Sequence, residues 1–306
     1  MISIIIVTYN SKNTISQCLD SIIKETIDKE IIVIDNSSID DSVHLIEQKL
    51  KGIPKSNLLI NKKNIGFAAA VNQGAKIARG DYLLILNPDT ILKEGALIEM
   101  KMLLDKYKQV GIVGPLLEDE NGNISFSTGV KWGMIYLIFR HVLPARMSNY
   151  ISMKKTLKLA EKNHPSLVSW VLGACFMIKK KLWNELGGLD ERFFLSADDT
   201  ADLCDRAFAL GIRTFFNPNA RVVHIGGVSY KDKLSTFAQI NVFKGHLLYI
   251  NKKNKFYSTI LRIIFIFISF IKAIVSSIFG LSNKKYKKLA KVHFISLLWL
   301  LKWQND

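Results

Sequence analysis

The sequence of 306 residues is poor in cysteine, with only Cys18, Cys175 and Cys204. They show no C-x-x-C or metal-like spacing, their number is odd and their surroundings are apolar, so we predict reduced core thiols. No secretory signal is visible, because the first apolar run, residues 2–7, is far too short for a signal h-region. We expect the fold to start at this run and the protein to work in the cytosol.

Acidic residues are scarce at the C-terminal end. The chain carries 42 Lys and Arg against 26 Asp and Glu, a formal net charge of +16. Residues 251–306 hold eleven of the basic residues and a single acid, Asp306, so about +10 of the surplus lies there. Such a surplus predicts an anionic partner: nucleic acid, a phosphorylated small molecule or a lipid surface.

Apolar runs alternate with helical segments over the first part of the chain. The pattern predicts strands at 2–7, 30–34, 57–61 and 82–86, separated by helices at 11–24, 40–50 and 68–78. This alternation is typical of βαβ units, so we predict an α/β fold with a mainly parallel sheet. Ligands of such sheets bind beyond the carboxyl ends of the strands. Those ends carry Thr8-Tyr9-Asn10, Asp35-Asn36 and Asn87-Pro88-Asp89.

The middle of the chain has a less regular pattern. Residues 131–163 have no clear periodicity and are interpreted as a mobile or acceptor-side segment. Asn121-Gly122 predicts a hairpin turn. The other predicted elements are helices at 94–107, 181–186 and 202–210 and strands at 110–115, 170–179, 213–216 and 221–224.

A strongly apolar helix is predicted near the C-terminus. Residues 260–281 are about long enough to span a bilayer, but Arg262 and Lys272 interrupt them, and a central Lys costs about 2.5–3.5 kcal/mol on insertion. On a helical projection both fall in one polar stripe with Ser269 and Ser276, which favours a helix lying in the membrane interface. A hydrophobic dimerisation helix, and hence a homodimer, is the alternative. An anionic-lipid patch is predicted from the lysines that follow, Lys284, Lys285, Lys287, Lys288 and Lys291.

Four polar groups could carry chemistry, and each has a structural alternative. Asp35 could bind a ribose or base, or form an Asx turn. Asp89 could hold a divalent cation, or belong to a simple turn. One of Asp198 and Asp199 could act as a general base, or cap a helix. His224 could ligate a metal and the glycines after it could approach a phosphate, or all could be structural.

The order of these motifs resembles family 2 glycosyltransferases with the GT-A fold. The resemblance covers about residues 1–230 and includes I-I-V-T-Y-N-S, V-I-D-N-S-S, N-I-G-F-A-A-A-V-N, L-I-L-N-P-D-T, G-G-L-D-E-R-F-F and D-L-C-D-R-A. The pattern is most similar to rhamnosyltransferase-like members that build O-antigen and other bacterial surface polysaccharides. It implies a catalytic domain over 1–230, with a nucleotide-binding half at 1–115 and an acceptor half at 116–230, and a basic, membrane-associating helical region at 231–306.

The resemblance also implies roles for individual residues. Asp89 and His224 would meet a metal ion, Mg²⁺ or Mn²⁺, and the diphosphate, while Asp199, with Asp198 as a competitor, would be the catalytic base. Residues implied for the donor nucleotide and the sugar or acceptor pocket are Thr8, Tyr9, Asn10, Asp35, Asn64, Gly66, Asn87, Trp170, Gly173 and Ala174.

Two departures from the family pattern bear on these roles. Asn87 stands where many members have the first acid of a D-x-D motif, so Asp89 is left as the single side-chain carboxylate for the metal. The family's E-D-x-D-L-C stretch is one residue longer here, D-D-T-A-D-L-C at 198–204, which keeps both Asp198 and Asp199 as candidates for the base.

The expected function is transfer of a sugar from a dTDP- or UDP-sugar with inversion of the anomeric configuration. The first candidate for the donor is dTDP-L-rhamnose. We expect the acceptor to be a saccharide or a lipid-linked oligosaccharide, and the protein to lie on the anionic inner surface of the cytoplasmic membrane. A polyprenyl-phosphate acceptor is an alternative. A dinucleotide-binding oxidoreductase is disfavoured because no G-x-G-x-x-G follows the first strand. A nucleic-acid-binding protein is disfavoured because the lysines of the tail are interleaved with apolar runs.

Overall fold

The computed structural model describes residues 1–129, 131, 133–143, 145–194, 198–226, 235–281 and 283–303. Its contacts divide the chain into two compact units. The sheet unit comprises Met1–Lys131, Tyr150–Glu191 and Asp199–Ser229, and the helical unit comprises Trp132–Asn149, Arg192–Asp198 and Tyr230–Asp306. The helical unit therefore takes two segments from the middle of the chain besides the C-terminal region.

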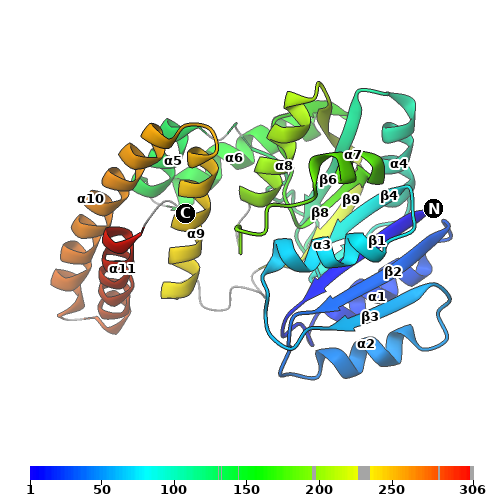
Figure 1. The fold of residues 1–306 in the computed structure, drawn as a ribbon, viewed down its shortest axis with the longest axis horizontal. Coiled ribbons are helices and arrows are strands. Elements are labelled where there is room, and N and C mark those ends of the chain that lie inside the picture. Colours follow the sequence, from blue (N-terminus) through cyan, green and yellow to red (C-terminus); the bar gives the residue numbers. More distant parts are fainter. Residues whose placement is uncertain are drawn as a thin grey trace. The chain divides into compact units, whose positions relative to one another are not determined.

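The first half of the sheet unit follows the predicted alternation closely. Apolar runs at 2–7, 31–34 and 83–86 form buried parallel strands, as expected for strands covered on both faces, whereas the strand at 56–60 is partly exposed. Neighbouring strands lie in the order β3-β2-β1-β4 (Figure 1). The elements are β1 (Ile2–Thr8), α1 (Ile15–Lys24), β2 (Lys29–Asp35), α2 (Ser42–Leu50), β3 (Ser56–Ile60), α3 (Phe67–Ile77) and β4 (Tyr82–Leu86).

The second half continues the same sheet with mixed strand directions. The order runs on from β4 as β8-β6-β9-β5, and β7 pairs with β9. β8 is antiparallel to β4 and β6, whereas β6 and β9 are parallel. The elements are β5 (Thr90–Leu92), α4 (Ala96–Lys106), β6 (Val110–Glu118), α6 (Ala145–Ala160), β7 (Ser166–Val168), β8 (Cys175–Lys179), α7 (Lys180–Leu186), α8 (Asp198–Ala209) and β9 (Arg213–His224).

Two predictions for this half were wrong in detail. The strand expected from Trp170 begins only at Cys175, because a turn occupies Gly173 and Ala174. The two short strands expected over 213–224 form one strand, β9, with a register shift opposite Pro115 and Leu116. Two helices, α5 (Met134–Val142) and α6, occupy most of the segment that was interpreted as mobile or acceptor-side, and that role stays a prediction.

The helical unit is built from α5, α9 (Thr236–Asn251), α10 (Lys255–Gly280) and α11 (Lys284–Lys302). Polar N-caps begin the last three helices: the side chains of Ser235, Asn254 and Asn283 accept from backbone N–H groups of the first turn. The short connection at 281–283 folds α11 back along α10 as a helical hairpin (Figure 1). α10 alone, among the described helices, is long and apolar enough to cross a membrane.

The polar stripe of α10 exists, but it faces the neighbouring helices instead of solvent. Ser258, Ser269 and Ser276 are buried, and their neighbours on this face include the buried Leu261 and Phe265. The opposite, apolar face is exposed. The sequence pattern identified the stripe correctly but could not show what it contacts.

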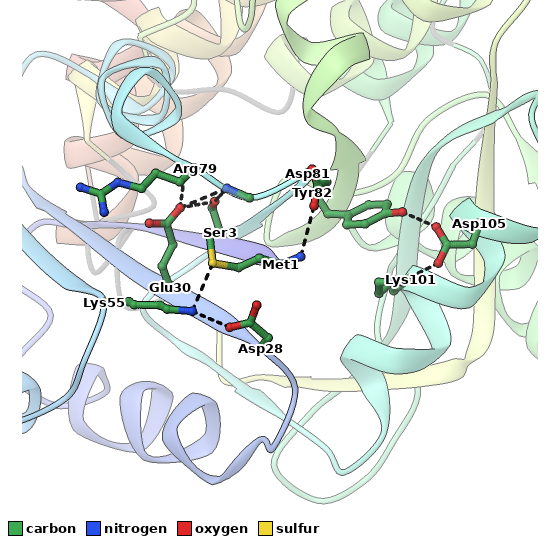
Figure 2. Close-up of polar contacts among 11 residues, drawn as sticks. Met1, Ser3, Asp28, Glu30, Lys55, Arg79, Asp81, Tyr82, Lys101 and Asp105 are labelled. Carbon is green, nitrogen blue, oxygen red and sulfur yellow. Dashed lines mark hydrogen bonds and ion pairs between the residues drawn. The ribbon is translucent and has the colours of Figure 1, made fainter.

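A cluster of polar contacts secures the amino edge of the sheet, opposite the carboxyl ends of the strands (Figure 2). The buried Glu30 accepts from the Ser3 hydroxyl at 2.5 Å and from the backbone N–H of Arg79 and Gly80. The N-terminal amine lies 3.2 Å from Asp81. These contacts satisfy a buried carboxylate with structural donors, so we assign this cluster to stability.

The three cysteines are free and buried, as predicted. Burial raises the pKa of Cys18 and of Cys204 to about 12. Both thiols are therefore protonated at neutral pH and shielded from solvent, which suits a packing role.

Candidate functional site

The carboxyl ends of β1 and β2 bring Thr8 and Asp35 side by side, because the two residues are register partners in the parallel pair. Both are fully buried, and the Thr8 hydroxyl has no hydrogen-bond partner. Asp35 accepts from the backbone N–H of Ser38 at 2.8 Å and from its hydroxyl at 2.5 Å. This backbone bond reaches three residues along the chain, one more than in the Asx turn that was the structural alternative for Asp35. It fixes the carboxylate at the edge of the sheet.

The loops after β1 and β2 are tied together through Asn10. Its backbone adopts a positive φ of 52°, its N–H donates to the Ser38 hydroxyl, and its side-chain oxygen accepts from Ile39. Tyr9, in contrast, is 47% exposed. An exposed aromatic ring in a fixed loop suits stacking on a planar base.

A network of side-chain amides joins the next loop to this edge. Asn61 donates to Asn36 and to Gln73, and Asn36 in turn donates to the backbone carbonyl of Gly66. Gly66 has a φ of 89°, which favours glycine, and its N–H donates to the Asn64 side chain. Asn64 and Gly66 thus sit in an ordered loop leading into α3. The sequence analysis did not predict roles for Asn61 and Gln73. Asn61 follows the end of β3 and Gln73 lies within α3, and a single amide side chain at such a position is no signal of function.

Asp89 and His224 meet although they are far apart in the sequence. β5 begins directly after Asp89 and pairs antiparallel with the end of β9, so that Thr90 is the register partner of His224. The backbone N–H of Ile225 donates to the Asp89 carbonyl at 2.9 Å. As a result, His224 Nε2 lies 3.4 Å from Asp89 Oδ1. The structure brings together the two residues proposed for the metal and diphosphate. Gly227, the second glycine of this motif, lies outside the described residues.

The chemistry of this pair fits a divalent cation. Asp89 is 3% exposed, and its Oδ1 has no hydrogen-bond partner among the described residues. This is costly for a buried carboxylate oxygen unless an ion or donor compensates it. Carboxylate oxygen and imidazole nitrogen are both metal ligands. Among the described residues no group of three or more His, Cys, Asp or Glu could hold a metal. A cation here would thus need ligands from the nucleotide diphosphate or water.

Asn87, Gly173 and Ala174 lie together beside this pair. The N–H of Asn87 donates to the carbonyl of Ala174 at 2.8 Å, and the Asn87 carbonyl accepts from the Thr90 hydroxyl at 2.6 Å. A Cβ at Gly173 would come within 2.8 Å of the Thr200 hydroxyl. Gly173 is therefore required to keep the start of α8 close to the turn before β8.

Trp170 is a core residue in the structure. It is 2% exposed, its ring contacts Phe126 edge-on at 5.5 Å, and its carbonyl accepts from the Thr128 hydroxyl. A Cβ at Gly129 would meet the indole ring at 2.6 Å. These contacts describe packing, and the role of Trp170 in lining a sugar pocket stays a prediction.

Three aspartates open α8, and their contacts differ. Asp199 is buried, and its Oδ1 accepts from the Thr200 hydroxyl at 3.0 Å. Asp202 pairs with Arg206 one turn further along, at 2.7 Å. Within the helical unit, Asp198 is fully buried and its Oδ1 lies 2.9 Å from Nδ1 of His246 on α9. Sequence reasoning missed His246, since a single histidine in an apolar helix gives no signal of its own.

Comparison with known families identifies the chain. The model of "Glycosyl transferase family 2" matches residues 3–184, which is more than half of the sequence. The chain belongs to glycosyl transferase family 2. The match confirms the predicted family.

Curated relatives agree with this assignment. The chain is 24% identical over 210 residues to N-acetylglucosaminyl-diphospho-decaprenol L-rhamnosyltransferase of Mycobacterium tuberculosis, covering 63% of this chain and 66% of that protein. It is 25% identical over 224 residues to the glycosyltransferase GlyG of Streptococcus pneumoniae, covering 72% and 69% of the two chains. The match thus spans about two thirds of the length of each relative.

Solved structures confirm the GT-A fold. The mannosyltransferase PcManGT of Pyrobaculum calidifontis, in complex with GDP-Man and Mn²⁺, superposes with a TM-score of 0.59 at 16% identity, over 100% of this chain and 88% of that one. GalNAc-T7 with UDP, GalNAc and Mn²⁺ gives a TM-score of 0.64 at 18% identity, over 99% and 56%. At identities this low, the superpositions show the fold and do not identify the substrates of this chain.

Proposed function

We propose that the protein is an inverting glycosyltransferase that uses a nucleotide-sugar donor. The observation that carries the proposal is the Asp89–His224 pair at the carboxyl edge of the sheet, in a chain of family 2. Among the described residues, Oδ1 of Asp89 has no hydrogen-bond donor, and it lies beside the His224 imidazole. A carboxylate and an imidazole in this position suit a divalent cation, which would in turn bind the diphosphate of the donor.

The donor nucleotide would bind at the ends of β1 and β2. Asp35 would accept from the ribose or base, and the exposed Tyr9 ring would stack on the base. Thr8 and Asn10 complete this edge, while Asn64 and Gly66 form the loop beside it. The unpartnered hydroxyl of Thr8 supports a polar ligand here, because buried hydroxyl groups normally have a partner.

A divalent cation, Mg²⁺ or Mn²⁺, would be held by Asp89 and His224 together with the donor diphosphate. When bound, it would neutralise charge on the leaving nucleoside diphosphate. Two solved neighbours of this fold are described with Mn²⁺ and a nucleotide or nucleotide sugar, which supports the same arrangement here. Asn87, in place of an acid, leaves Asp89 as the carboxylate of this motif.

Asp199 is the proposed general base. The acceptor hydroxyl would attack the anomeric carbon, its proton would pass to Asp199, and the bond from that carbon to the diphosphate oxygen would break, with inversion. Asp199 takes the place of the family's catalytic aspartate when the D-D-T-A-D-L-C stretch is counted from its N-terminal end, and Asp198 is the competing candidate, with one oxygen 2.9 Å from Nδ1 of His246. We therefore assign Asp198 and His246 to positioning the start of α8.

The proposed donor is dTDP-L-rhamnose, and the proposed acceptor is a lipid-linked saccharide. The relative from M. tuberculosis is named for transfer of L-rhamnose to N-acetylglucosaminyl-diphospho-decaprenol, which supports both choices. A polyprenyl phosphate as acceptor is the second candidate of the same fold. A lipid-linked acceptor would place the reaction on the inner face of the cytoplasmic membrane, as part of surface polysaccharide synthesis.

The test compares Asp199→Asn with Asp205→Asn, a matched substitution on the same helix. With dTDP-L-rhamnose, Mn²⁺ and a diphosphate-linked N-acetylglucosamine acceptor, Asp199→Asn should lower kcat at least about 10²-fold, the lower range for losing a general base. Donor affinity, measured by calorimetry, should stay within about 3-fold, and Asp205→Asn should retain activity. Near-normal transfer by Asp199→Asn would overturn the assignment of the base.

A further inference from the structure

The outward face of α10 carries large apolar side chains from Ile263 to Phe279. Ile263, Phe267 and Ile278 are 60%, 63% and 61% exposed, although they are large side chains. The other members of this face are Phe270, Ile271, Ile274, Val275 and Phe279. Contiguous exposed apolar surface of this kind marks a surface that is covered in the working protein.

Three polar residues of α10, Ser258, Arg262 and Lys272, point the other way, into the helical unit. Arg262 donates through Nε to the carbonyl of Leu300 at 2.8 Å and through Nη2 to that of Leu301 at 2.9 Å. Lys272 Nζ donates to the carbonyl of His141 at 2.6 Å, and the buried Ser258 hydroxyl donates to Leu247. A helix bordering water would place these groups outside and the phenylalanines inside. The arrangement is the one expected where the surroundings are hydrocarbon, since ionisable groups then face the protein.

The surface beside this face is strongly basic. The five lysines at the start of α11 are exposed, and they follow directly after the end of α10. The ring of Phe279 contacts that of Tyr286 at 5.5 Å, so the apolar face and the basic segment adjoin. The basic lysines are Lys284, Lys285, Lys287, Lys288 and Lys291.

We propose that the outward face of α10, named above by its residues, inserts into one leaflet of an anionic phospholipid bilayer, with the lysines of α11 on the headgroups. A second copy of the chain suits this surface less well, because it would cover the apolar face without supplying the negative charge that the lysines match. An anionic leaflet provides both the hydrocarbon and the opposite charge. The inference rests on the helical unit alone and holds whichever sugar is transferred.

The geometry points to a helix lying in the leaflet rather than crossing it. α10 and α11 form a hairpin, so a crossing by α10 would carry the connection at 281–283 and the five lysines to the far side. Lysines near membrane segments remain on the cytoplasmic side. A crossing would also place Arg262 and Lys272 in the hydrocarbon core of the bilayer, where ionisable side chains are costly.

Vesicle binding tests the surface. The full chain should co-sediment with vesicles of phosphatidylcholine and phosphatidylglycerol, at least about 10-fold more than with phosphatidylcholine alone, and less at high salt. The triple variant Phe267→Asp, Ile274→Asp, Ile278→Asp should co-sediment with these vesicles at least about 10-fold less than the wild type does. As a matched control, Ile98→Asp with Met102→Asp, on the exposed side of α4, should bind as the wild type does. Thermal unfolding of all three proteins checks that they are folded.

Retained vesicle binding by the folded triple variant would overturn the proposal. So would a wild-type dimer that the triple variant converts to a monomer without loss of vesicle binding, since the face would then cover a second copy.

Cysteine labelling tests the orientation. Leu281 is 91% exposed at the tip of the hairpin, and the native cysteines are buried, so Leu281→Cys provides a single reactive thiol. A membrane-impermeant maleimide should label it in lysed spheroplasts and not in intact ones. Labelling in intact spheroplasts would show that α10 crosses the membrane, which contradicts the in-plane arrangement.

Discussion

His246 Nδ1 and Asp198 Oδ1 lie 2.9 Å apart, and both side chains are almost completely buried. The pair joins α9 to the first residue of α8, immediately before the proposed base Asp199. Breaking a contact between two buried polar side chains leaves their polar atoms less well satisfied, which lowers stability.

Removing this partner should destabilise the protein. We expect His246→Ala to lower the free energy of unfolding of the helical unit by about 3–5 kcal/mol, the range for breaking a buried pair. It should also lower kcat about 10-fold or more while the KM for the donor changes little, because Asp199 loses its support. His246→Asn, which keeps a donor near Nδ1, should restore part of both.

A double-mutant cycle separates the pair from general damage. Asp198→Asn combined with His246→Ala should cost less than the two single changes added together. Additive losses in denaturant unfolding would show that the contact carries no coupling.

The Asp89–His224 pair predicts how the protein depends on divalent cations. Asp89→Asn should weaken binding of Mn²⁺ in the presence of nucleoside diphosphate, and kcat/KM should fall about 10²–10³-fold, as for loss of a group that stabilises developing charge. His224→Ala should have a smaller effect in the same direction. Calorimetric titration of Mn²⁺ measures the binding. An Asp89→Asn protein that binds Mn²⁺ and nucleotide as tightly as the wild type would contradict the pair's proposed role.

Gly173 should not tolerate even one added methyl group. A Cβ there would lie 2.8 Å from the Thr200 hydroxyl, so Gly173→Ala must displace the start of α8 next to Asp199. We expect kcat to fall about 10-fold or more, as small misplacements of catalytic groups have large effects. Thr200→Ala removes the opposing oxygen. Gly173→Ala added to Thr200→Ala should therefore cost much less than Gly173→Ala alone, and an equal cost in both backgrounds would exclude the steric explanation.

His141 should make the helical unit sensitive to acid. Burial, followed by the charges of His246, Lys272 and Arg140, holds the pKa of His141 well below 6.5. Its ring stacks on Phe243 at 4.9 Å, and Nε2 has no hydrogen-bond partner. The unfolded chain binds a proton below about pH 6.5 that the folded protein does not, so the stability contribution is present above that pH and is lost as pH falls.

The variant His141→Phe should flatten this dependence. Phenylalanine keeps the aromatic contacts and the backbone carbonyl that accepts from Lys272, and it cannot take up a proton. Between pH 7 and pH 5 the wild type should lose more thermal stability than the variant. Parallel pH profiles for the two proteins would show that His141 is not the group responsible.

Local patterns in the sequence predicted the first half of the sheet, because β1, β2 and β4 are unbroken apolar runs whose burial decides their structure. The joining of Asp89 to His224 depends on pairing between β5 and β9, which local patterns do not contain. Only the resemblance to the family placed both residues at one site.

The helical unit was harder to predict for two reasons. α5 opens with a continuous apolar run from Met134 to Phe139, and a short run of this kind does not by itself distinguish a helix from a strand. The stripe on α10 was visible, but a stripe alone does not tell whether it faces water or another helix. The contacts of Arg262 and Lys272 with backbone carbonyls supplied that answer.

The most direct test of the account is to identify the reaction product. Purified protein is incubated with dTDP-L-rhamnose, Mn²⁺ and a diphosphate-linked N-acetylglucosamine lipid, and the product is analysed by mass spectrometry and NMR. The account predicts release of the nucleoside diphosphate and addition of one sugar with the opposite anomeric configuration from the donor. Transfer with retained configuration, or no transfer from any member of a panel of dTDP- and UDP-sugars, would contradict it.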